Sequence, residues 1–343
     1  MSDQRIAVIG AGSWGTALAN LLAKKGLQTV LWSYEREVAE AIRLEHRNPR
    51  YLSEVVLDPS LQVTDSIPEA VRGASIVVSV SPSHVVRAVM GEAAPYIEEG
   101  ALVVSASKGI EEHSLLTMDG VLREVLGEAH ARRTAFLSGP SFALEVALEY
   151  PTAVTMASHD LASARRAQGL FQTDYFRVYT NPDVAGVELG GALKNVIAIA
   201  AGVVDGLGYG HNTRAALITR GLAEMTRLGV ALGADPLTFA GLAGMGDLIL
   251  TCTGALSRNH SVGEELGKGR PIDEILAGMT MVAEGVRTSR AARALAARAG
   301  IEMPIVEEVY AVLYEGRSPR EALENLMLRE PKPEQWSQWE RRK

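Results

Sequence analysis

The sequence feature that most constrains the fold is a glycine-rich segment near the amino terminus. The apolar run Arg5–Ile9 leads directly into Gly10-Ala-Gly12-Ser-Trp-Gly15, and the next ten residues have the composition of a helix. In such a strand–turn–helix unit, Gly10 permits the tight turn and Gly12 lets the backbone approach a pyrophosphate, while Gly15 lets the helix pack closely on the sheet. The segment therefore predicts a dinucleotide-binding loop whose helix amides hold the phosphates. A purely structural turn is the alternative.

The remaining sequence predicts two regions of different architecture. From Arg5 to about Asp183, β-rich runs alternate with helix-like stretches, which is typical of a parallel sheet covered on both faces. The expected strands are Arg5–Ile9, Thr29–Trp32, Ser75–Val80, Ala101–Ser105, Thr134–Leu137 and Ala153–Ala157. After Asn181 such runs disappear and apolar residues recur at helical spacing. We therefore predict an α/β fold, with a Rossmann-like doubly wound parallel sheet in residues 1–183, an all-α helical domain in 184–330 and a loosely ordered polar tail in 331–343.

Composition excludes several classes of partner. A length of 343 residues suits two domains. The net charge of -7 and the pI near 5.6 argue against nonspecific binding to nucleic acid or to an anionic membrane. The single cysteine, Cys252, cannot form an internal disulfide, and no signal peptide, membrane anchor or metal-ligand spacing is evident. We expect a cytoplasmic protein.

The end of the second expected strand bears on the choice of nicotinamide cofactor. Ser33 follows Trp32 at the position where NAD-specific enzymes usually carry an acid that binds the ribose hydroxyls. Arg36 offers a guanidinium to a 2'-phosphate, although Glu35 intervenes. We therefore favour NADP(H), with NAD(H) possible. The alternative for Arg36 is a solvated charge on a helix face.

Lys194 is the most informative single residue in the helical region. It is the only basic side chain between Val178 and Gly210, and it lies within a run of small and apolar residues. Such a lysine either extends its ammonium group to water or is held partly desolvated, which favours the neutral amine and suits it for proton transfer. Hydride delivery to a ketone leaves a developing alkoxide, which a nearby ammonium can stabilise and protonate.

Two loops that follow expected strands carry further candidates. Lys108 follows the strand Ala101–Ser105, at the carboxyl edge of the sheet where ligands bind, although an ordinary exposed lysine is the alternative. Gly139 and Ser141 follow the strand Thr134–Leu137 and precede a helix-like run. Their amides are placed to meet an anion, whereas simple N-capping by Ser141 is the other reading.

Two further segments in the second half provide an acid and a phosphate-binding group. Asp247 lies beside an apolar run, with Thr251 four residues later on the same helical face. The triplet Ser257-Arg258-Asn259 offers a guanidinium flanked by a hydroxyl and an amide, which suits a phosphate. A solvated turn is the alternative for this triplet.

Taken together, these segments resemble the bacterial NAD(P)-dependent glycerol-3-phosphate dehydrogenase family over nearly the whole chain. The resemblance is carried by Gly10–Ala19, Ser107–Glu111, Ser138–Ala143, Gly190–Ala201, Asn212–Leu222, Gly244–Thr253, Ser257–Asn259 and Val282–Gly285. It implies a Rossmann-like domain and a helical domain with the substrate between them. It also implies reduction of dihydroxyacetone phosphate to sn-glycerol 3-phosphate with NAD(P)H, a reversible reaction that supplies phospholipid synthesis.

The resemblance also implies roles for individual residues. Lys194 matches the family's general acid/base, and we group Lys108 and Asp247 with it as catalytic. The positions that match substrate contacts are Lys108, Gly139, Ser141, Lys194, Asp247, Ser257, Arg258 and Asn259. Besides the three glycines, the positions that match cofactor contacts are Ser13, Trp14, Tyr34, Lys108, Ala143, Arg258, Val282 and Glu284. Tyr34 stands where some relatives have a histidine or arginine.

Other functions remain to be weighed against this one. The chain can instead be a related two-domain dehydrogenase that acts on a hydroxy acid or a sugar phosphonate. It can also be a nucleotide-sensing protein without turnover, but that reading predicts the loss of Lys194 or Asp247, and both are present. A structural protein is disfavoured because long heptads and repeats are absent from the sequence. The many small residues on helical faces of the second half lead us to expect a homodimer.

Overall fold

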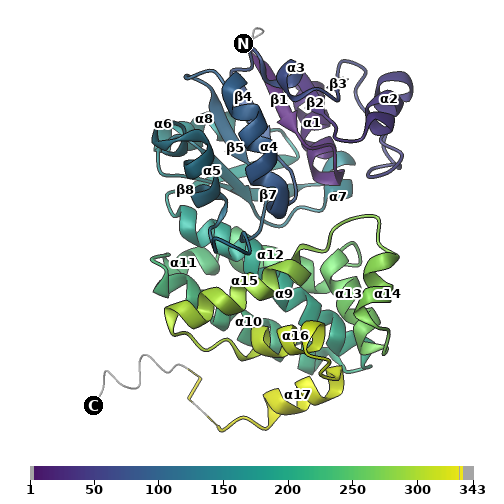
Figure 1. The fold of residues 1–343 in the computed structure, drawn as a ribbon, viewed down its shortest axis with the longest axis vertical. Coiled ribbons are helices and arrows are strands. Elements are labelled where there is room, and N and C mark those ends of the chain that lie inside the picture. Colours follow the sequence, from purple (N-terminus) through teal and green to yellow (C-terminus); the bar gives the residue numbers. More distant parts are fainter. Residues whose placement is uncertain (1–3, 332, 335–343) are drawn as a thin grey trace.

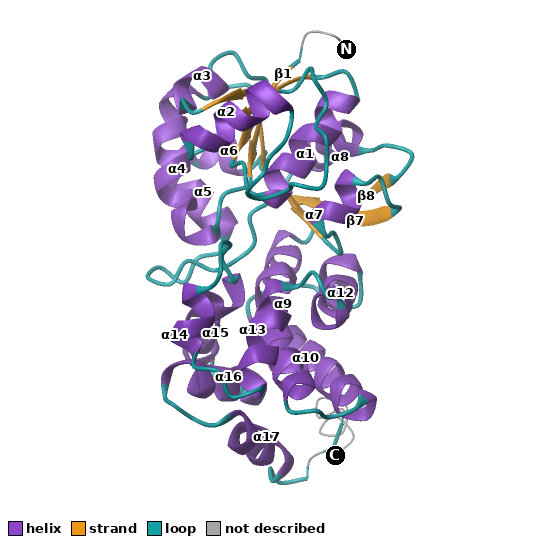
Figure 2. Cartoon of the chain, turned by 90° about the vertical axis from the view of Figure 1, so that its right-hand side faces the viewer, coloured by secondary structure: helices purple, strands orange, loops and turns teal. Residues whose placement is uncertain are grey.

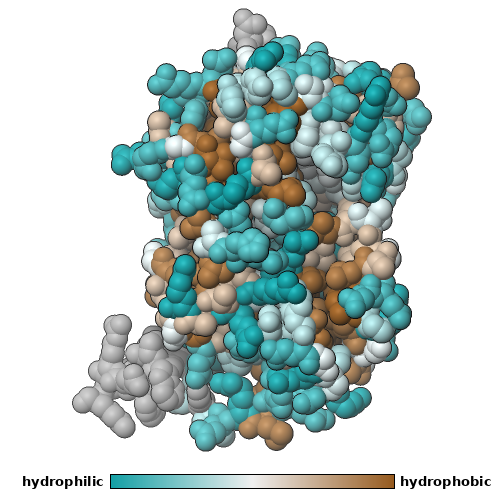
Figure 3. All heavy atoms as spheres, viewed as in Figure 1, coloured by the Kyte–Doolittle hydropathy of each residue, from teal (hydrophilic) through white to brown (hydrophobic). Residues whose placement is uncertain are grey.

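The computed structural model describes residues 4–331, 333 and 334 and divides into two halves (Figure 1). The upper half in this view contains the sheet, whereas the lower half consists of helices and loops. Most of the polar tail expected at 331–343 lies outside the described residues. Figure 3 shows a largely hydrophilic surface on this side, with hydrophobic residues gathered around the waist between the halves.

The upper half is built on one eight-stranded sheet with the order β3-β2-β1-β4-β5-β6-β7-β8. The strands are β1 Arg5–Ile9, β2 Gln28–Trp32, β3 Gln62–Thr64, β4 Ile76–Ser79, β5 Leu102–Ser105, β6 Ala135–Ser138, β7 Thr152–Ser158 and β8 Phe176–Asn181. All neighbouring strands are parallel except β6 and β7. Because β1 lies between β2 and β4, the chain reverses direction across the sheet at β1. The loops after β1 and β4 therefore flank the position where such sheets bind ligands.

Helices cover both faces of the sheet (Figure 2). Those of the upper half are α1 Ser13–Lys24, α2 Arg36–Glu45, α3 Ile67–Val71, α4 Val86–Ala93, α5 Met118–Leu126, α6 Glu128–Ala131, α7 Ala143–Ala147 and α8 Leu161–Phe171, with short 3-10 turns η1 Ser83–Val85 and η2 Ala94–Tyr96. Alternate residues of β1 enter different cores, with Ile6 and Val8 on one face and Ala7 and Ile9 on the other. Burial on both faces explains why the central strands have continuous apolar sequences.

The sequence predicted six strands of this sheet and missed its two edge strands. All six expected strands are present, with ends that differ by a few residues. The expected parallel sheet is present, with one exception, because β7 runs antiparallel to β6. The connecting α7 has five residues, too few to run back along the sheet as a parallel crossover requires. The strands β3 and β8 were missed. Only three residues form β3, and β8 alternates buried Phe176 and Val178 with exposed Arg177 and Tyr179.

The lower half is organised around one long helix. Its elements are α9 Val184–Gly206, α10 His211–Ala231, α11 Pro236–Phe239, the π-helical turn η3 Leu242–Gly246, α12 Asp247–Thr253, α13 Arg258–Gly267, α14 Ile272–Ala277, α15 Glu284–Ala299, α16 Pro304–Tyr314 and α17 Pro319–Met327. The side chain of Asp183 caps α9 by accepting a hydrogen bond from the backbone N–H of Gly186. Helices α10, α12, α13 and α15 pack around α9.

Two segments of this half are long and apolar enough to cross a membrane by composition, but their surroundings are those of a protein core. The apolar window of α9 is 100% buried inside the protein. The second segment, Pro236–Thr253, is 44% buried and carries Asp247, whose side chain packs against the two candidate lysines. Both segments are thus core elements of the helical half.

Candidate active site

The glycine-rich loop has the shape that its sequence predicts. Gly10 has a φ of 122°, which favours glycine, and a side chain there would approach the carbonyl of Val80 in the loop after β4. A Cβ on Gly15 would lie 1.8 Å from the carbonyl oxygen of Gly10. In contrast, a Cβ on Gly12 would have no atom within 4 Å. The turn is therefore closely packed at Gly10 and Gly15 and open at Gly12. Gly12 is the N-cap residue of α1, where a pyrophosphate fits.

A residue from a distant turn supports this loop. Asn48 is fully buried and donates hydrogen bonds to the carbonyl of Ala11 and to the hydroxyl of Thr16, both at 2.8 Å. Its side-chain oxygen accepts the backbone N–H of Tyr51. Sequence reasoning missed Asn48. The Asn48-Pro49 pair signals a turn, but nothing in it indicates a contact with the glycine loop.

Lys194, Lys108 and Asp247 meet where the two halves join. The Lys194 Nζ donates hydrogen bonds to Asp247 Oδ1 and, at 2.9 Å, to the hydroxyl of Thr251. The Lys108 Nζ, from the loop after β5, donates to Asp247 Oδ2 at 2.8 Å and to the carbonyl of Gly139 at 3.2 Å. One carboxylate thus connects a lysine from each half. Lys194 is largely withdrawn from solvent and Lys108 is not an ordinary exposed lysine, since their side chains are 9% and 18% exposed.

The electrostatics of this cluster follow from its burial. Burial and, to a smaller extent, the charge of Lys108 lower the pKa of Lys194, while Asp247 opposes the change, and the resulting pKa is about 8. Burial alone would raise the pKa of Asp247, but the charges and hydrogen bonds of the two lysines hold it below its usual range. Asp247 is therefore ionised at neutral pH. Lys194 changes its charge close to neutral pH, as a group that transfers protons should.

Glycines allow the two halves to approach at this point. A Cβ on Gly191 of α9 would lie 2.7 Å from the Ser138 hydroxyl at the end of β6 and 3.4 Å from Lys108 Cδ. Gly139 has a φ of 129° and presents its carbonyl to Lys108. Ser141 does not cap the next helix, because its hydroxyl donates to the Gly139 carbonyl and Phe142 occupies the N-cap position.

The triplet Ser257-Arg258-Asn259 forms the start of α13 and not a solvated turn. Ser257 is the N-cap and accepts the backbone N–H of His260. Arg258 is exposed and donates to the carbonyl of Val282 at 2.9 Å. The Asn259 side chain is buried between helices, where it donates to Asn195 of α9 and accepts the backbone N–H of Gly285.

The segment before α15 reaches back to the sheet half. The Ser13 hydroxyl in the glycine loop lies 3.2 Å from Met281 Sδ. Glu284 accepts hydrogen bonds from the backbone N–H and the hydroxyl of Ser83, at 3.0 and 2.6 Å. Met281 thus contacts the glycine loop, Val282 contacts Arg258, and Glu284 contacts the turn after β4.

The expected cofactor contacts at the rim of the loop lie in two places. Trp14 and Ala143 pack in one small cluster where α7 meets α1. Tyr34, at 82% exposure, stands at the end of β2 beside exposed Arg36 and has no hydrogen bond to the other predicted site residues. Ser33 is fully buried and donates to the Glu35 carbonyl, so its hydroxyl does not face the solvent.

A cavity of about 410 Å³ lies elsewhere, between α15, α16 and α17. None of the predicted site residues lines it. The chemical groups that suit a phosphorylated ketone are gathered instead at the junction of the halves, so we place the candidate active site there.

Comparison with known proteins identifies the family of the chain. The chain matches the models described as NAD-dependent glycerol-3-phosphate dehydrogenase N-terminus over residues 5–164 and C-terminus over residues 183–324. It is 59% identical over 334 residues to a glycerol-3-phosphate dehydrogenase [NAD(P)+] of Geobacter sulfurreducens, covering 97% of this chain and 100% of that protein. It is 53% identical to the protein of the same name from Myxococcus xanthus, covering 96% and 98%.

Solved structures support the same relationship. The crystal structure of glycerol-3-phosphate dehydrogenase from Coxiella burnetii superposes with a TM-score of 0.92 at 38% identity, covering 96% of this chain and 100% of that one. A ketopantoate reductase from Ralstonia eutropha reaches a TM-score of 0.59 at 16% identity, which shows a shared fold only. The chain therefore belongs to the NAD-dependent glycerol-3-phosphate dehydrogenase family, and it is an enzyme that interconverts dihydroxyacetone phosphate and glycerol 3-phosphate with a nicotinamide cofactor.

Proposed function

We propose that Lys194 is the general acid/base of this reaction and that Asp247 and Lys108 complete the catalytic group. The observation that carries this proposal is the buried contact of Lys194 with Asp247 and Thr251, opposite Lys108. When bound, the reduced nicotinamide supplies the hydride to the ketone carbon. The Lys194 ammonium then gives its proton to the developing alkoxide, and the neutral amine takes it back in the reverse direction.

Asp247 keeps this proton available. As an ionised carboxylate between two lysines, it holds Lys194 in one orientation and offsets the repulsion between the ammonium groups. Lys108 is placed to stabilise negative charge on the substrate at the carboxyl end of the sheet. Its second hydrogen bond, to the Gly139 carbonyl, puts Gly139 and Ser141 at the edge of the same site.

The substrate phosphate is held at the start of α13. Arg258 has an exposed guanidinium with further donors besides the one that meets Val282. The backbone N–H groups of Arg258 and Asn259 begin the helix and suit an anion. The Ser257 hydroxyl accepts from His260 and still has its own proton to donate. The Asn259 side chain acts by fixing α13 against α9 and α15.

The nicotinamide cofactor lies along the glycine loop of Gly10, Gly12 and Gly15. The additional cofactor contacts that we propose are Ser13, Trp14, Tyr34, Lys108, Ala143, Arg258, Val282 and Glu284. NADP(H) is favoured over NAD(H). Arg36 is exposed at the start of α2, and the acid beside it, Glu35, accepts a hydrogen bond from the Tyr51 hydroxyl at 2.5 Å.

The cellular setting is a further part of the proposal. The enzyme works in the cytoplasm as a homodimer and reduces dihydroxyacetone phosphate to sn-glycerol 3-phosphate for phospholipid synthesis. Residues 1–183 form the cofactor domain and 184–330 the substrate domain. The last strand ends at Asn181 and α9 begins at Val184, which supports this boundary.

The deciding experiment follows NAD(P)H absorbance with dihydroxyacetone phosphate for the wild type and Lys194→Ala. We expect kcat to fall by about two to four orders of magnitude while NADPH binding, measured by fluorescence titration, is retained. Lys268→Ala changes an exposed lysine and is the control. Since the ammonium form is the acid, wild-type reduction should decline as pH rises through about 8, and oxidation of glycerol 3-phosphate should rise. Full activity of Lys194→Ala would refute the assigned role.

A further inference from the structure

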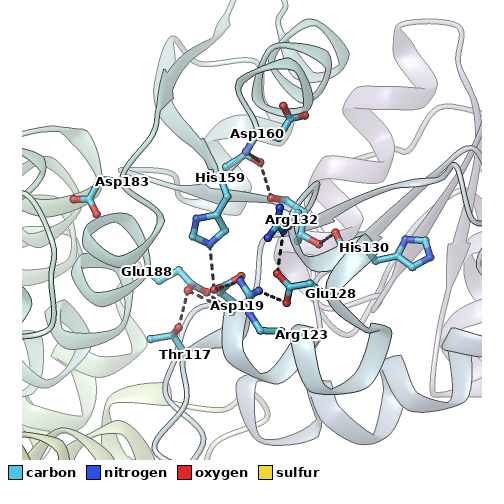
Figure 4. Close-up of polar contacts among 12 residues, drawn as sticks. Thr117, Asp119, Arg123, Glu128, His130, Arg132, His159, Asp160, Asp183 and Glu188 are labelled. Atoms are coloured by element: carbon cyan, nitrogen blue, oxygen red, sulfur yellow. Dashed lines mark hydrogen bonds and ion pairs between the residues drawn. The ribbon is translucent and has the colours of Figure 1, made fainter.

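Glu188 connects the two halves at a point beside the active site. It belongs to α9, which also carries Lys194. Its Oε2 accepts a hydrogen bond from the Thr117 hydroxyl at 2.7 Å, and its Oε1 accepts one from the backbone N–H of Asp119 at 3.0 Å (Figure 4). Thr117 is the N-cap residue of α5 but makes no side-chain cap bond to that helix. A carboxyl group from the helical half therefore caps a helix of the sheet half.

The charged groups around this contact satisfy one another. The Asp119 carboxylate pairs with Arg123 and lies near His159, both at 3.2 Å, and Arg123 also pairs with Glu128 (Figure 4). Among the described residues, no lysine or arginine forms an ion pair with Glu188. Burial and the charge of Asp119 raise the pKa of Glu188, while the hydrogen bonds from Thr117 and Asp119 oppose the change, and the resulting pKa is about 8. Glu188 therefore acts mainly through hydrogen bonds and not through its charge.

The helix that Glu188 caps ends the loop that carries Lys108. This loop leaves β5, and Ile110 pairs with Thr117 across it in an isolated antiparallel bridge. A backbone hydrogen bond from Glu111 to Leu116 closes it further. Lys108 lies at the start of this closed loop and Thr117 at its end. A contact that fixes Thr117 therefore also restricts the movement of Lys108. Lys108 and Glu188 also line the same small cavity, together with Ser105, Ser107 and Ser138.

We propose that Glu188 is a positioning residue for the reaction, which holds the Lys108 loop of the sheet half in register with Lys194 on α9. The inference rests on the proposed substrate contact of Lys108. A misplacement of about 1 Å at a reacting group is enough to lower the rate substantially. Glu188 sets the distance between two lysines that come from different halves, and it does so without touching the substrate.

A matched pair of substitutions tests this role. Glu188→Met keeps the length of the side chain and removes the hydrogen-bond acceptors. Glu224→Met is the control, because Glu224 of α10 is buried and accepts the backbone N–H of Ile305 near the start of α16, entirely within the helical half. Both variants should lower the melting temperature by a few degrees. Only Glu188→Met should raise KM for dihydroxyacetone phosphate, by about tenfold. Glu188→Gln, which keeps both hydrogen-bond positions, should restore the wild-type KM to within about threefold.

A double-mutant cycle separates this proposal from the role of Lys108. If Glu188 acts through Lys108, Glu188→Met should change KM by less than about twofold in a Lys108→Ala background. An equal effect in both backgrounds, or an equal rise of KM in Glu224→Met, would overturn the positioning role. An unchanged KM in Glu188→Met alongside impaired Lys108→Ala would overturn it while leaving the proposed function intact. Full activity of Lys108→Ala would instead remove the proposed contact and the inference that depends on it.

Discussion

The cofactor loop and the lysine–carboxylate cluster are assembled in different ways. The loop from Gly10 to Gly15 is continuous in sequence, and its own backbone determines its shape. The cluster joins Lys108, Lys194 and Asp247, and Lys108 is separated from Asp247 by 139 positions. The loop belongs to one half of the molecule, whereas the cluster exists only because the two halves are packed together.

This difference in assembly implies a difference in energetics. In the loop, the main constraint is steric, because a side chain at Gly15 would overlap the backbone of Gly10. In the cluster, the main constraint is electrostatic, because three charged groups are withdrawn from water and must compensate one another. Substitutions of Lys194 or Asp247 should therefore impair chemistry with cofactor binding intact, whereas substitutions in the loop should mainly weaken cofactor binding.

Of the three substitutions that probe this contrast, Asp247→Asn should have the largest effect. The amide keeps the shape of the side chain but leaves two lysines without a counter-charge, so the pKa of Lys194 should fall below about 8 and less of it should be protonated at neutral pH. We expect kcat for reduction to drop by about two to three orders of magnitude. NADPH affinity should stay within about threefold of the wild type. Steady-state kinetics and fluorescence titration measure these quantities.

The control for this substitution is Asp160→Asn, at the N-cap of α8, where asparagine caps as well as aspartate. It should leave kcat and stability unchanged. A large loss of NADPH affinity in Asp247→Asn would mean that the cluster and the cofactor loop are not separable.

An intermediate effect is expected for Gly15→Ala. The added methyl group overlaps the Gly10 carbonyl and forces the start of α1 to move. We expect the dissociation constant for NADPH to rise at least about tenfold and the melting temperature to fall by several degrees. Gly91→Ala is the matched control, because Gly91 lies in α4 with open space around its Cα and should tolerate or slightly favour alanine. Unchanged cofactor binding in Gly15→Ala would contradict the steric account of the loop.

The same contrast explains what could be predicted from the sequence. The glycine loop was predicted with its context because strand, turn and helix are contiguous. Lys194 was selected as a candidate because a single basic residue interrupts a long apolar helix. The pairing of Asp247 with both lysines was not predicted, since it depends on how the halves pack. Glu188 gave no signal at all, because a glutamate near a helix start usually faces solvent.

Missed features of the fold have a similar origin. The edge strand β8 alternates apolar and polar residues, whereas the expected strands were identified from β-rich apolar runs. The antiparallel β7 was placed correctly along the chain, but its direction depends on the short connection through α7. Local pattern thus identifies elements, while the connections between them determine how they pair.

The smallest effect is expected at the edge of the cofactor loop, for Arg36→Ala. Arg36 begins α2 with a side chain that is 79% exposed and forms an ion pair with Glu40. Such an exposed ion pair contributes little free energy, so Arg36 can leave it at little cost to contact a 2'-phosphate. We expect kcat/KM for NADPH to fall about three- to tenfold and that for NADH to change by less than about twofold, because only NADPH carries the additional phosphate. Arg43→Ala, in the last turn of the same helix, should change neither value. Parallel assays with both cofactors measure the ratio. An equal loss with both cofactors would show that Arg36 supports the loop instead of selecting the cofactor, and specificity would then have to depend on the exposed Tyr34.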